Sequence, residues 1–596
     1  MNSITENTVD LVNNYNLSSS QANCKIEISR DNKKIIRVCK NGKWIYLGSK
    51  YNVTRDINNI LNKIKDTDSK TLIVIFGLAS GEYINELVKY IKEDNKVLIV
   101  EPSIEIIKLF LKENDRNLLE DERIYLVNFS KKLRDLLSGI IKIENLYDMV
   151  PIIYPVYDRI FSSECIEFLK YLNSARNDLM IEFNTTLAIS KNIFYSTIRN
   201  IRSISNSLPV NKFKNKFKGM SAIVVSAGPS LEKNIDYLKR IQDDFIIISG
   251  LRNLKGLLKI GIVPDFLCIL DTLDINYRFI EGCTNINIPI VFHEASSYKV
   301  IDKYTGPKIL FLRNPKFSEF LGKQVDALYQ GGSVAHICTS FAAYIGCSTI
   351  IFIGQDLAYT NDKFHAKSAS FGDEVEVHED EKKYDLVDDI YGNKIKTDSV
   401  FNMFREKLED FIKHNKNIKF INSTEGGADI KGTSVMSLKK SASMYGIKGK
   451  RAILSNTKDL YKNKFDKLKL KESILKNKKD LENIRNYIDR NEENINKFQL
   501  YYNGATSLNI NKIMNNLDKL DRFIKKSCSE FVLINDLLAP ITLEAMYRRD
   551  LSVYSEDSDK DKGRKIAKKY KILYSNIKNG IDLAVPLFEN AANGLD

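Results

Sequence analysis

A turn of small residues follows an apolar, β-branched run near the middle of the sequence. The run at residues 222–225 is typical of a buried strand, and a polar helical segment begins just after the turn. Glycine permits the close approach of a ligand, and free backbone N–H groups at a helix start favour a phosphate. A purely structural strand–helix turn is the alternative interpretation. The candidate anion-binding residues here are Ser226, Ala227, Gly228, Pro229 and Ser230.

Small or polar residues also follow four other apolar runs, in "SGLRN", "ILDT", "HEAS" and "GQDLAYT", and a glycine pair in "QGGSVAH" opens a helical run. The carboxyl ends of parallel strands meet at one edge of a sheet, where open α/β sheets bind ligands. Each residue alone is an ordinary helix cap or loop residue, but together they favour one ligand site. The candidates are Arg252, Asn253, Asp271, Thr272, Gly331, Gly332, Ser333, Gln355, Asp356 and Tyr359.

The elements that position these residues alternate between apolar strands and amphipathic helices, which predicts an α/β fold with a doubly wound, Rossmann-like central sheet. A strand near Phe420 is expected to complete that sheet. The last part of the chain has helical spacing only and predicts a bundle of about four to six helices, with a charged loop at residues 553–565. The predicted division is an N-terminal α/β domain with initial β-hairpins (1–158), a helical connector (159–215), the central domain (216–445) and a C-terminal helical domain (446–596).

Composition is that of an ordinary globular protein, with 43% hydrophobic and 28% charged residues among 596. Basic and acidic residues alternate along the chain, so the net charge of +14 is interpreted as spread out and argues against a nucleic-acid partner. The polar N-terminus, the lack of a membrane-spanning apolar run and eight cysteines without a CxxC pair predict a cytoplasmic protein with reduced thiols. No P-loop, HExxH motif or clear DxD motif is present, and no metal site is predicted.

Four segments carry a family resemblance: "GMSAIVVSAGPSLEKN", "GIVPDFLCILDT", "QGGSVAHICTSFAAYIGCSTIIFIGQDLAYT" and "INSTEGGADIKGT". Together, over about residues 215–435, they resemble the motility-associated factor (Maf) family of flagellin glycosyltransferases, and the central domain is similar to family 42 bacterial sialyltransferases. The resemblance implies transfer of a nonulosonic acid of pseudaminic, legionaminic or sialic type, or of Kdo, from its CMP-activated form to Ser or Thr of flagellin. It also implies an inverting reaction without metal or cofactor, a role in flagellum assembly and motility, and flagellin binding by the C-terminal helices.

Such a reaction needs donors for the departing phosphate and a general base for the acceptor hydroxyl. The turn at residues 227–230, Gly332, Ser333 and Tyr359 are expected to meet the phosphate. His365 is the first candidate for the base and His378 the second, with Asp356 orienting the base or binding the acceptor. The loop residues expected to close the site are Thr424, Glu425, Gly426 and Gly427.

Three other functions remain open from the sequence. "VIFGLASGEY" followed by Glu101 resembles the glycine loop and ribose-binding acid of S-adenosylmethionine-dependent methyltransferases, although a glycine turn kept for packing is the favoured interpretation. The central domain also resembles an archaeal pterin pyrophosphokinase family, for which Asp271 and Asp356 are the available metal ligands. A flagellin chaperone or export adaptor without catalysis would use the C-terminal helices alone.

Overall fold

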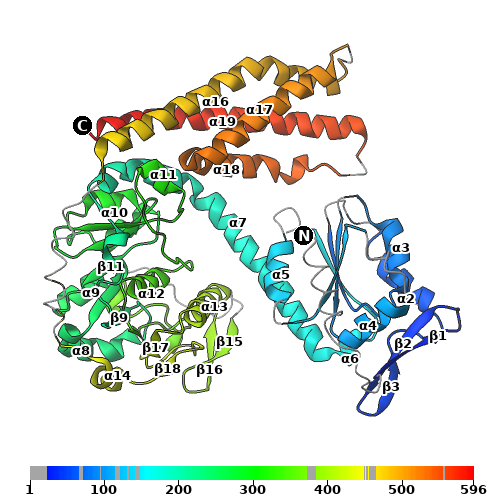
Figure 1. Ribbon diagram of the computed structural model, residues 1–596, viewed down its shortest axis with the longest axis horizontal. Helices are drawn as coiled ribbons and strands as arrows, with labels where there is room; N and C mark the ends of the chain where they lie inside the picture. Colours follow the sequence, from blue (N-terminus) through cyan, green and yellow to red (C-terminus); the bar gives the residue numbers. More distant parts are fainter. Residues whose placement is uncertain are drawn as a thin grey trace. The chain divides into compact units, whose positions relative to one another are not determined.

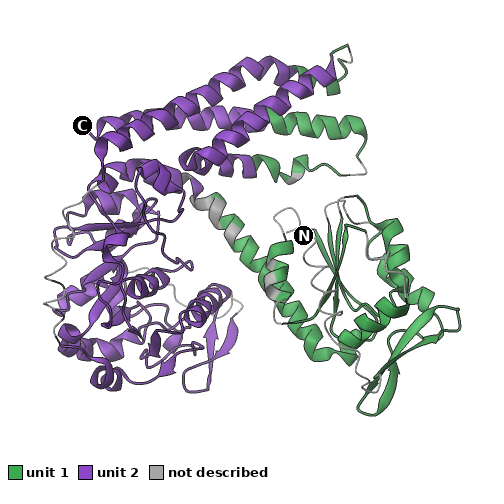
Figure 2. Ribbon diagram, viewed as in Figure 1, with its two compact units in different colours: residues 1–187, 497–508, 544–571 green, residues 188–496, 509–543, 572–596 purple. Residues whose placement is uncertain are grey.

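A computed structural model of the chain describes residues 23–65, 67, 71–93, 95–113, 121–130, 133–141, 148–371, 384–448, 450, 454, 465–505, 507–554 and 557–596 (Figure 1). It divides into two compact units (Figure 2): unit 1 comprises residues 1–187, 497–508 and 544–571, and unit 2 comprises residues 188–496, 509–543 and 572–596. The two units do not coincide with the four domains predicted from the sequence, because each unit contains parts of the C-terminal helical region as well as parts of the preceding domains.

Unit 1 contains an antiparallel sheet of three strands and a parallel sheet of four. The parallel sheet has the order β6-β5-β4-β7, and its central strands are apolar throughout because both faces are covered. The predicted hairpins are confirmed, and the glycine loop in "VIFGLASGEY" joins β4 to α3, with Glu101 at the end of β5. The elements are β1 (Cys24–Ile28), β2 (Lys34–Lys40), β3 (Lys43–Tyr46), α2 (Val53–Leu61), β4 (Leu72–Phe76), α3 (Glu82–Tyr90), β5 (Lys96–Glu101), α4 (Ile104–Glu113), β6 (Ile124–Asn128), α5 (Leu133–Ile140), β7 (Met149–Ile153), α6 (Tyr157–Ile160) and the long α7 (Ser162–Ser205).

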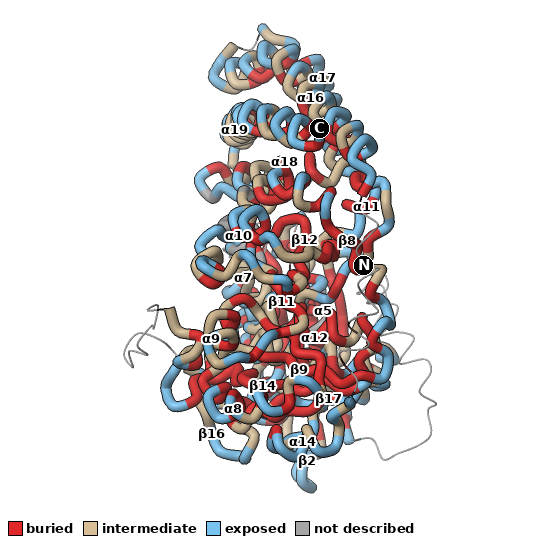
Figure 3. The backbone as a smooth tube through the Cα atoms, turned by 90° about the vertical axis from the view of Figure 1, so that its left-hand side faces the viewer, coloured by how far each residue is buried: buried red, intermediate tan, exposed pale blue. Residues whose placement is uncertain are grey.

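Unit 2 is built on a nine-stranded sheet of order β18-β17-β14-β9-β10-β11-β12-β13-β8, in which every neighbouring pair is parallel. Strand order reverses between β9 and β14, and a reversal of this kind opens a crevice at the carboxyl ends of the two strands. Buried residues run along the strands of this sheet (Figure 3). Its strands are β8 (Leu208–Pro209), β9 (Ser221–Val225), β10 (Ile246–Gly250), β11 (Phe266–Cys268), β12 (Ile290–His293), β13 (Lys308–Phe311), β14 (Thr349–Ile353), β17 (Lys419–Asn422) and β18 (Ser434–Val435).

The helices that accompany this sheet follow most of its strands. They are α8 (Leu231–Ile241), α9 (Leu254–Lys259), α10 (Tyr298–Lys303), α11 (Phe317–Leu321), α12 (Val334–Tyr344), α13 (Ser399–His414) and α14 (Leu438–Tyr445). A separate hairpin, β15 (Asp385–Asp388) and β16 (Lys394–Thr397), precedes α13. The strand predicted near Phe420 is β17, but it is not the edge of the sheet, because the two-residue strands β18 and β8 flank the ends.

The C-terminal region is helical, as predicted, and consists in its described part of α16 (Lys467–Tyr502), α17 (Ile510–Glu530), α18 (Val532–Met546) and α19 (Asp559–Asn593). Buried residues of α16 recur at Ile474, Leu481, Ile484 and Ile488, the three- and four-residue spacing of helices packed side by side. Ion pairs such as Arg485–Asp582 at 2.6 Å join α16 to α19. The mixed α/β class with parallel sheets and a helical carboxyl-terminal region is confirmed.

The charged loop expected at residues 553–565 is shorter than predicted. Helix α19 begins at Asp559, because Ser558 Oγ accepts the backbone N–H of Asp561 and caps the helix start. The acidic Asp559 and Asp561 suit the first turn of a helix. In the described residues, no helix is both long and apolar enough to cross a membrane.

Candidate functional site

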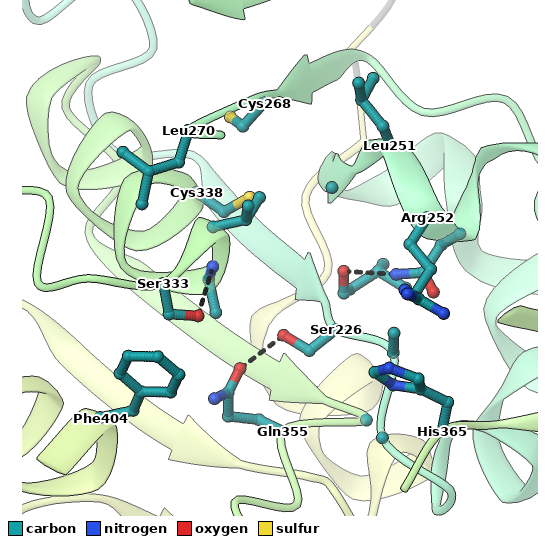
Figure 4. A pocket seen from close by; sticks show the side chains of 18 of the residues that line it. Ser226, Leu251, Arg252, Cys268, Leu270, Ser333, Cys338, Gln355, His365 and Phe404 are labelled. Carbon is teal, nitrogen blue, oxygen red and sulfur yellow. Dashed lines mark hydrogen bonds between the residues drawn. The ribbon is translucent and has the colours of Figure 1, made fainter. Parts of the chain in front are cut away.

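A pocket of about 390 Å³ opens in unit 2 at the carboxyl ends of β9, β10, β11 and β14, where the strand order reverses (Figure 4). A volume of this size suits a nucleotide-sized ligand. Eleven candidate residues from the sequence line this pocket: Ser226, Ala227, Gly228, Arg252, Asn253, Asp271, Gly332, Ser333, Gln355, Asp356 and His365. Because residues from five separate segments meet here, the predicted clustering at one edge of the sheet is found in the structure.

The turn after β9 has fewer free N–H groups than the sequence suggests. Ser226 N–H donates to Ile353 O at 3.0 Å, and Gly228 N–H donates to Gly354 O at 2.8 Å. The N–H of Ser230 faces both carboxylate oxygens of Asp356 at 3.3 Å, and Pro229 has no N–H. The expectation that residues 227–230 cradle a phosphate with their backbone is therefore not met by Gly228 and Ser230. The turn instead shapes one wall of the pocket.

Asp356 holds this turn in place. Its carboxylate accepts the hydroxyls of Ser230 at 2.7 Å and of Thr360, and burial raises its pKa. A Cβ atom at Gly228 would lie only 2.0 Å from Asp356 Oδ2, so only glycine fits there. With its acceptor positions filled by protein donors, Asp356 is placed to position the turn rather than to orient a base or bind an acceptor.

Two other groups present donors to the pocket. Ser226 donates its hydroxyl to Gln355 Oε1, which leaves the Gln355 amide nitrogen without a partner in the described residues (Figure 4). Helix α12 begins at the pocket with Ser333 as its N-cap, whose hydroxyl accepts the N–H of Ala335 at 3.3 Å. The positive end of the helix dipole of α12 therefore lies on this side of the pocket, although Ser333 already accepts the N–H groups of Ala335 and His336.

Arg252 supplies a fixed positive charge on another wall. Its guanidinium carbon lies 4.6 Å from the centre of the Phe279 ring, and its Nη1 donates to Ala369 O at 3.4 Å. Asp271 lines the same pocket, exposed at a concave wall; partial desolvation raises the pKa of its carboxyl, and the Arg252 charge opposes that rise. The pocket thus carries an arginine and a carboxylate side by side on its lining.

Asn253 ties the ends of two strands together beside Arg252. Its Nδ2 donates to Val225 O at 2.9 Å, which links the turn after β10 to the end of β9. Its Oδ1 is buried and has no hydrogen-bond partner within the described residues. A buried acceptor without a partner is costly, and a ligand O–H or N–H would satisfy it.

His365 lies on the segment that follows β14, with its ring directed into the pocket (Figure 4). The ring stands perpendicular to that of Phe364, with the two centres 4.6 Å apart. The next residue, Ala366, donates its N–H to Ala227 O at 2.8 Å, so the segment is pinned against the turn after β9. This arrangement fixes an imidazole near Arg252 and the strand ends.

Two other histidines of unit 2 are structural. Burial lowers the pKa of His293 and of His336 to about 4, so both are neutral at pH 7. His293 Nε2 bonds Leu270 O at 2.6 Å, and His336 Nε2 bonds Phe404 O at 2.9 Å, which requires the proton on Nε2 in each ring. His378, the second candidate for the base, lies outside the described residues.

Nine candidate residues lie away from the pocket lining. Glu425 Oε1 accepts Asn234 Nδ2 and the N–H of Leu438, both at 3.0 Å, so this side chain joins α8 to the start of α14. Tyr359 donates its hydroxyl to Asp398 Oδ2 at 2.6 Å within a cluster of aromatic rings. The loop expected to close the site packs instead behind Asp356. The nine residues are Pro229, Ser230, Thr272, Gly331, Tyr359, Thr424, Glu425, Gly426 and Gly427.

The structure adds an aromatic wall to the pocket that the sequence did not indicate. Phe401 and Phe404 line it from one face of α13, and Phe279 and Asn276 line it from the turn after β11. The three-residue spacing of Phe401 and Phe404 places both rings on one face of a helix and could have indicated this wall. The same spacing is equally typical of a helix that faces a core. Burial raises the pKa of the Cys268 thiol well above its usual value, so this lining cysteine is not a nucleophile at neutral pH.

The glycine loop of unit 1 is filled by its own side chains. Fully buried Glu101 accepts the N–H of Leu78 at 2.8 Å, the N–H of Ser103 at 2.9 Å and the hydroxyl of Tyr157 at 2.7 Å. Desolvation raises its pKa to about 7. A Cβ at Gly77 would lie 2.9 Å from the ring of Tyr157. The acid that a methyltransferase would use for a ribose is occupied, which agrees with a glycine turn kept for packing.

Among the described residues, no three His, Cys, Asp or Glu side chains gather to hold a metal ion. Both carboxylates considered for metal binding line the pocket, but the oxygens of Asp356 already accept hydroxyls of the protein.

Comparison with known proteins gives two related matches. The family model of MptE-like 6-hydroxymethylpterin diphosphokinases matches residues 195–362. The 6-hydroxymethyl-7,8-dihydropterin pyrophosphokinase of Methanocaldococcus jannaschii is 25% identical over 194 residues, which cover 30% of this chain and 78% of that protein. Residues 195–362, which the family model matches, include the turn after β9 and the ends of β10, β11 and β14.

A solved structure of a Maf glycosyltransferase from Magnetospirillum magneticum AMB-1 is similar to the whole chain. The TM-score is 0.55 at 14% sequence identity, with 100% of this chain and 95% of that chain covered. The resemblance to the Maf family inferred from the four motifs is thereby confirmed at the level of the fold.

Proposed function

We propose that this chain is a glycosyltransferase that moves a nonulosonic acid from its CMP-activated donor to Ser or Thr hydroxyls of flagellin, in support of flagellum assembly and motility. The observation that carries the proposal is the pocket at the strand-order reversal, with Ser333 and Gln355 on one side and Arg252 and His365 on the other (Figure 4). The fold shared with a Maf glycosyltransferase supports the same conclusion.

The donor carries two anionic groups, a phosphate and the carboxylate of the sugar, and the pocket presents donors on two sides. The start of α12 and the Gln355 amide suit the phosphate, which leaves with CMP and gains charge in the transition state. Arg252 suits the carboxylate, because a guanidinium makes paired hydrogen bonds to that group. The aromatic wall suits the flat nucleobase.

In the proposed step the acceptor oxygen forms a bond to the anomeric carbon while the bond from that carbon to the phosphate oxygen breaks. CMP departs with the electron pair, the configuration inverts, and the proton of the acceptor hydroxyl passes to His365. An imidazole is suited to this task because its ordinary pKa lies near neutral pH. The carboxylate sits on the anomeric carbon itself, so the group that binds it must lie beside the base, as Arg252 does on this lining.

The test is the intact mass of flagellin co-expressed with this chain and a nonulosonic acid pathway. The wild-type chain is expected to produce a ladder of masses spaced by one sugar, and His365→Ala is expected to reduce modification about a hundredfold or more, the usual loss for a general base. His414→Ala is the matched control, because His414 is exposed on α13 and outside the pocket lining. Removal of metal ions with EDTA is expected to leave the rate unchanged.

A ladder that persists with His365→Ala would keep the transferase and reject this base. Absence of any ladder, together with absence of CMP binding by calorimetry, would reject the transferase. In that case binding of unmodified flagellin would favour a chaperone or export adaptor, and transfer of a methyl group from S-adenosylmethionine would favour the methyltransferase.

A pterin pyrophosphokinase is the second candidate, favoured by the match over residues 195–362. It would require a divalent cation. Asp271 is the better placed of the two carboxylates on the lining, because Asp356 already accepts the hydroxyls of Ser230 and Thr360. Incubation with ATP, magnesium and the hydroxymethyl-dihydropterin distinguishes the two: formation of the pterin diphosphate would replace the first proposal.

A further inference from the structure

One short stretch near the start of the chain is strongly basic. Residues 23–51 hold eight Lys and Arg and two Asp and Glu, a difference of six within a chain whose net charge is +14. These residues form the antiparallel sheet β1-β2-β3 of unit 1. The even spread expected from the sequence is therefore wrong for this segment.

One face of this sheet packs on the core of unit 1, and the other brings cations and aromatic rings together. The register sets Lys25 opposite Arg37 and Arg37 opposite Tyr46, in one row across the three strands. Trp44 follows on the same face, with Lys25 Nζ 5.1 Å and the Arg37 guanidinium 4.8 Å from its ring centre. Side chains alternate between the faces of a strand, so these four share the outer face.

Lys50 extends the outer face through its contact with Tyr46. A further cation–ring pair, Arg30 with Tyr51, lies just beyond the strand ends, where the N–H of Arg30 donates to Lys50 O at 3.1 Å. Lys50 Nζ lies 4.9 Å from the Tyr46 ring, and the Arg30 guanidinium lies 4.5 Å from the Tyr51 ring. We call this set the basic face: Lys25, Arg30, Arg37, Lys50, Trp44, Tyr46 and Tyr51. Its acidic member, Glu27, is engaged by Arg37 at 2.8 Å and by the Tyr46 hydroxyl at 2.7 Å. The charges of Arg37, Lys50 and Lys25 thus act on this one acid, while Arg30 stands beside Tyr51.

Other basic residues of the segment are used inside unit 1. Lys33 pairs with Glu82 at 3.5 Å, Lys34 Nζ donates to Glu113 O at 2.6 Å, and Lys40 donates to Ile160 O. The basic face is different, because its cations lie over exposed rings: Trp44 is 38% exposed and Tyr51 is 64% exposed. Cations and amphipathic rings on one outer face are the combination found at anionic membrane surfaces.

We propose that the basic face binds the anionic surface of a lipid bilayer. Phosphate and carboxylate headgroups reach the four cations directly from solvent, and Trp44 and Tyr51 sit at headgroup depth. A single-stranded nucleic acid fits less well, because its bases stack on open aromatic faces. Here each ring already carries a cation within about 5 Å, which a base would have to displace.

The test uses the full-length chain and the fluorescence of Trp44, the single tryptophan of the sequence. Vesicles of phosphatidylcholine with about one third phosphatidylserine are expected to shift the Trp44 emission to shorter wavelength and to co-sediment with the protein. Pure phosphatidylcholine vesicles are expected to do neither. High salt is expected to release the protein, because the attraction is electrostatic and acts over about one Debye length.

The variant is Lys25→Gln, Arg30→Gln and Lys50→Gln combined, which is expected to weaken partitioning about a hundredfold, at about fivefold for each cation removed. The matched control is Lys239→Gln, Lys259→Gln and Lys416→Gln, three exposed lysines of unit 2 that change the net charge equally. Full retention by the control and loss by the first variant would support the basic face as the site.

Three outcomes would overturn the proposal. These are equal binding to neutral vesicles, equal weakening by the control variant, and an unchanged Trp44 emission on anionic vesicles. A Trp44 response to a single-stranded oligothymidylate without a response to vesicles would assign the face to nucleic acid instead. If the triple variant folds poorly, the dependence of wild-type binding on salt and on anionic lipid still tests the proposal.

Discussion

Arg252 is the single Lys or Arg among the described residues that line the pocket, and this makes its charge the simplest to test. Arg252→Met is expected to weaken binding of CMP-N-acetylneuraminic acid roughly 10- to 100-fold, since a charge-assisted pair contributes about 1.5–3 kcal/mol. Binding of CMP alone is expected to change little, because CMP lacks the sugar carboxylate. Calorimetry with the two ligands measures the difference.

The exposed Arg240 of α8 offers the matched control for this change. Arg240→Met is expected to leave both affinities unchanged. Equal weakening of CMP and of the CMP-sugar by Arg252→Met would place the guanidinium on the phosphate and contradict the assignment.

Asp356 is a residue whose role is positional, so its substitution is expected to show in stability as well as activity. Asp356→Asn replaces one acceptor oxygen by an amide N–H2, which then faces the hydroxyl of either Ser230 or Thr360 and also the N–H of Ser230. Mismatched buried donors cost about 1–3 kcal/mol each, so the free energy of unfolding is expected to fall by about 2–4 kcal/mol. Urea unfolding followed by circular dichroism measures it.

Asp362 provides the comparison, because its carboxylate is exposed and meets only Lys396 at 3.4 Å. Asp362→Asn is expected to change the unfolding free energy by less than about 0.5 kcal/mol. Similar stability in the two variants would mean that the Asp356 network does not hold the turn after β9.

At the scale of elements, β5 and α6 of unit 1 meet at Glu101, whose pKa is raised to about 7 by burial. Its usual value is 4.5, so between pH 4.5 and 7 the folded state keeps a proton that the unfolded state releases. The free energy of unfolding therefore falls as pH rises through this window, by about 3 kcal/mol in total. Glu101→Gln is expected to remove that dependence.

Trp44 lies in unit 1, so its fluorescence during urea unfolding reports this unit separately. Unit 2 is expected to behave oppositely. The pKa values of His293 and His336 are lowered to about 4, so below about pH 6.5 the unfolded state binds protons that the two buried rings do not. The free energy of unfolding of unit 2 is therefore expected to fall as pH falls below about 6.5. A Trp44-detected stability that is equally pH-dependent in wild type and Glu101→Gln would contradict the role given to Glu101.

At the scale of the whole molecule, the chain segment after α14 remains attached to the central sheet of unit 2. Lys450 Nζ pairs with Asp265 at 2.6 Å and also donates to Gln242 O at 2.6 Å, and both side chains of the pair are almost fully buried. Lys450, which lies just beyond the central domain predicted from the sequence (216–445), thus packs on the sheet of that domain.

Lys450→Met is expected to lower the unfolding free energy of the full-length chain by about 3 kcal/mol, because it leaves the buried Asp265 charge without its partner. Asp265→Asn together with Lys450→Met is expected to recover part of that loss, since no buried charge then remains. Circular dichroism during urea unfolding measures both. A double variant less stable than the single one would show that the pair is not coupled in this way.

The sequence by itself determined the alternation of strands and helices, the hairpins of β1–β3, the parallel sheets and eleven of the residues that line the pocket. These follow from local patterns: apolar runs predict buried strands, and polar residues at parallel strand ends must share one edge. Ser226, Arg252, Ser333, Gln355 and His365 were found in this way.

Only the tertiary structure decided how the polar groups are used. Hydrogen bonds between segments distant in sequence occupy Asp356, Glu101 and Glu425, and no local pattern indicates such partners. The aromatic wall from α13 and the gathering of Lys25 and Arg37 with Trp44 and Tyr46 on one sheet face arise in the same way, from packing and strand register.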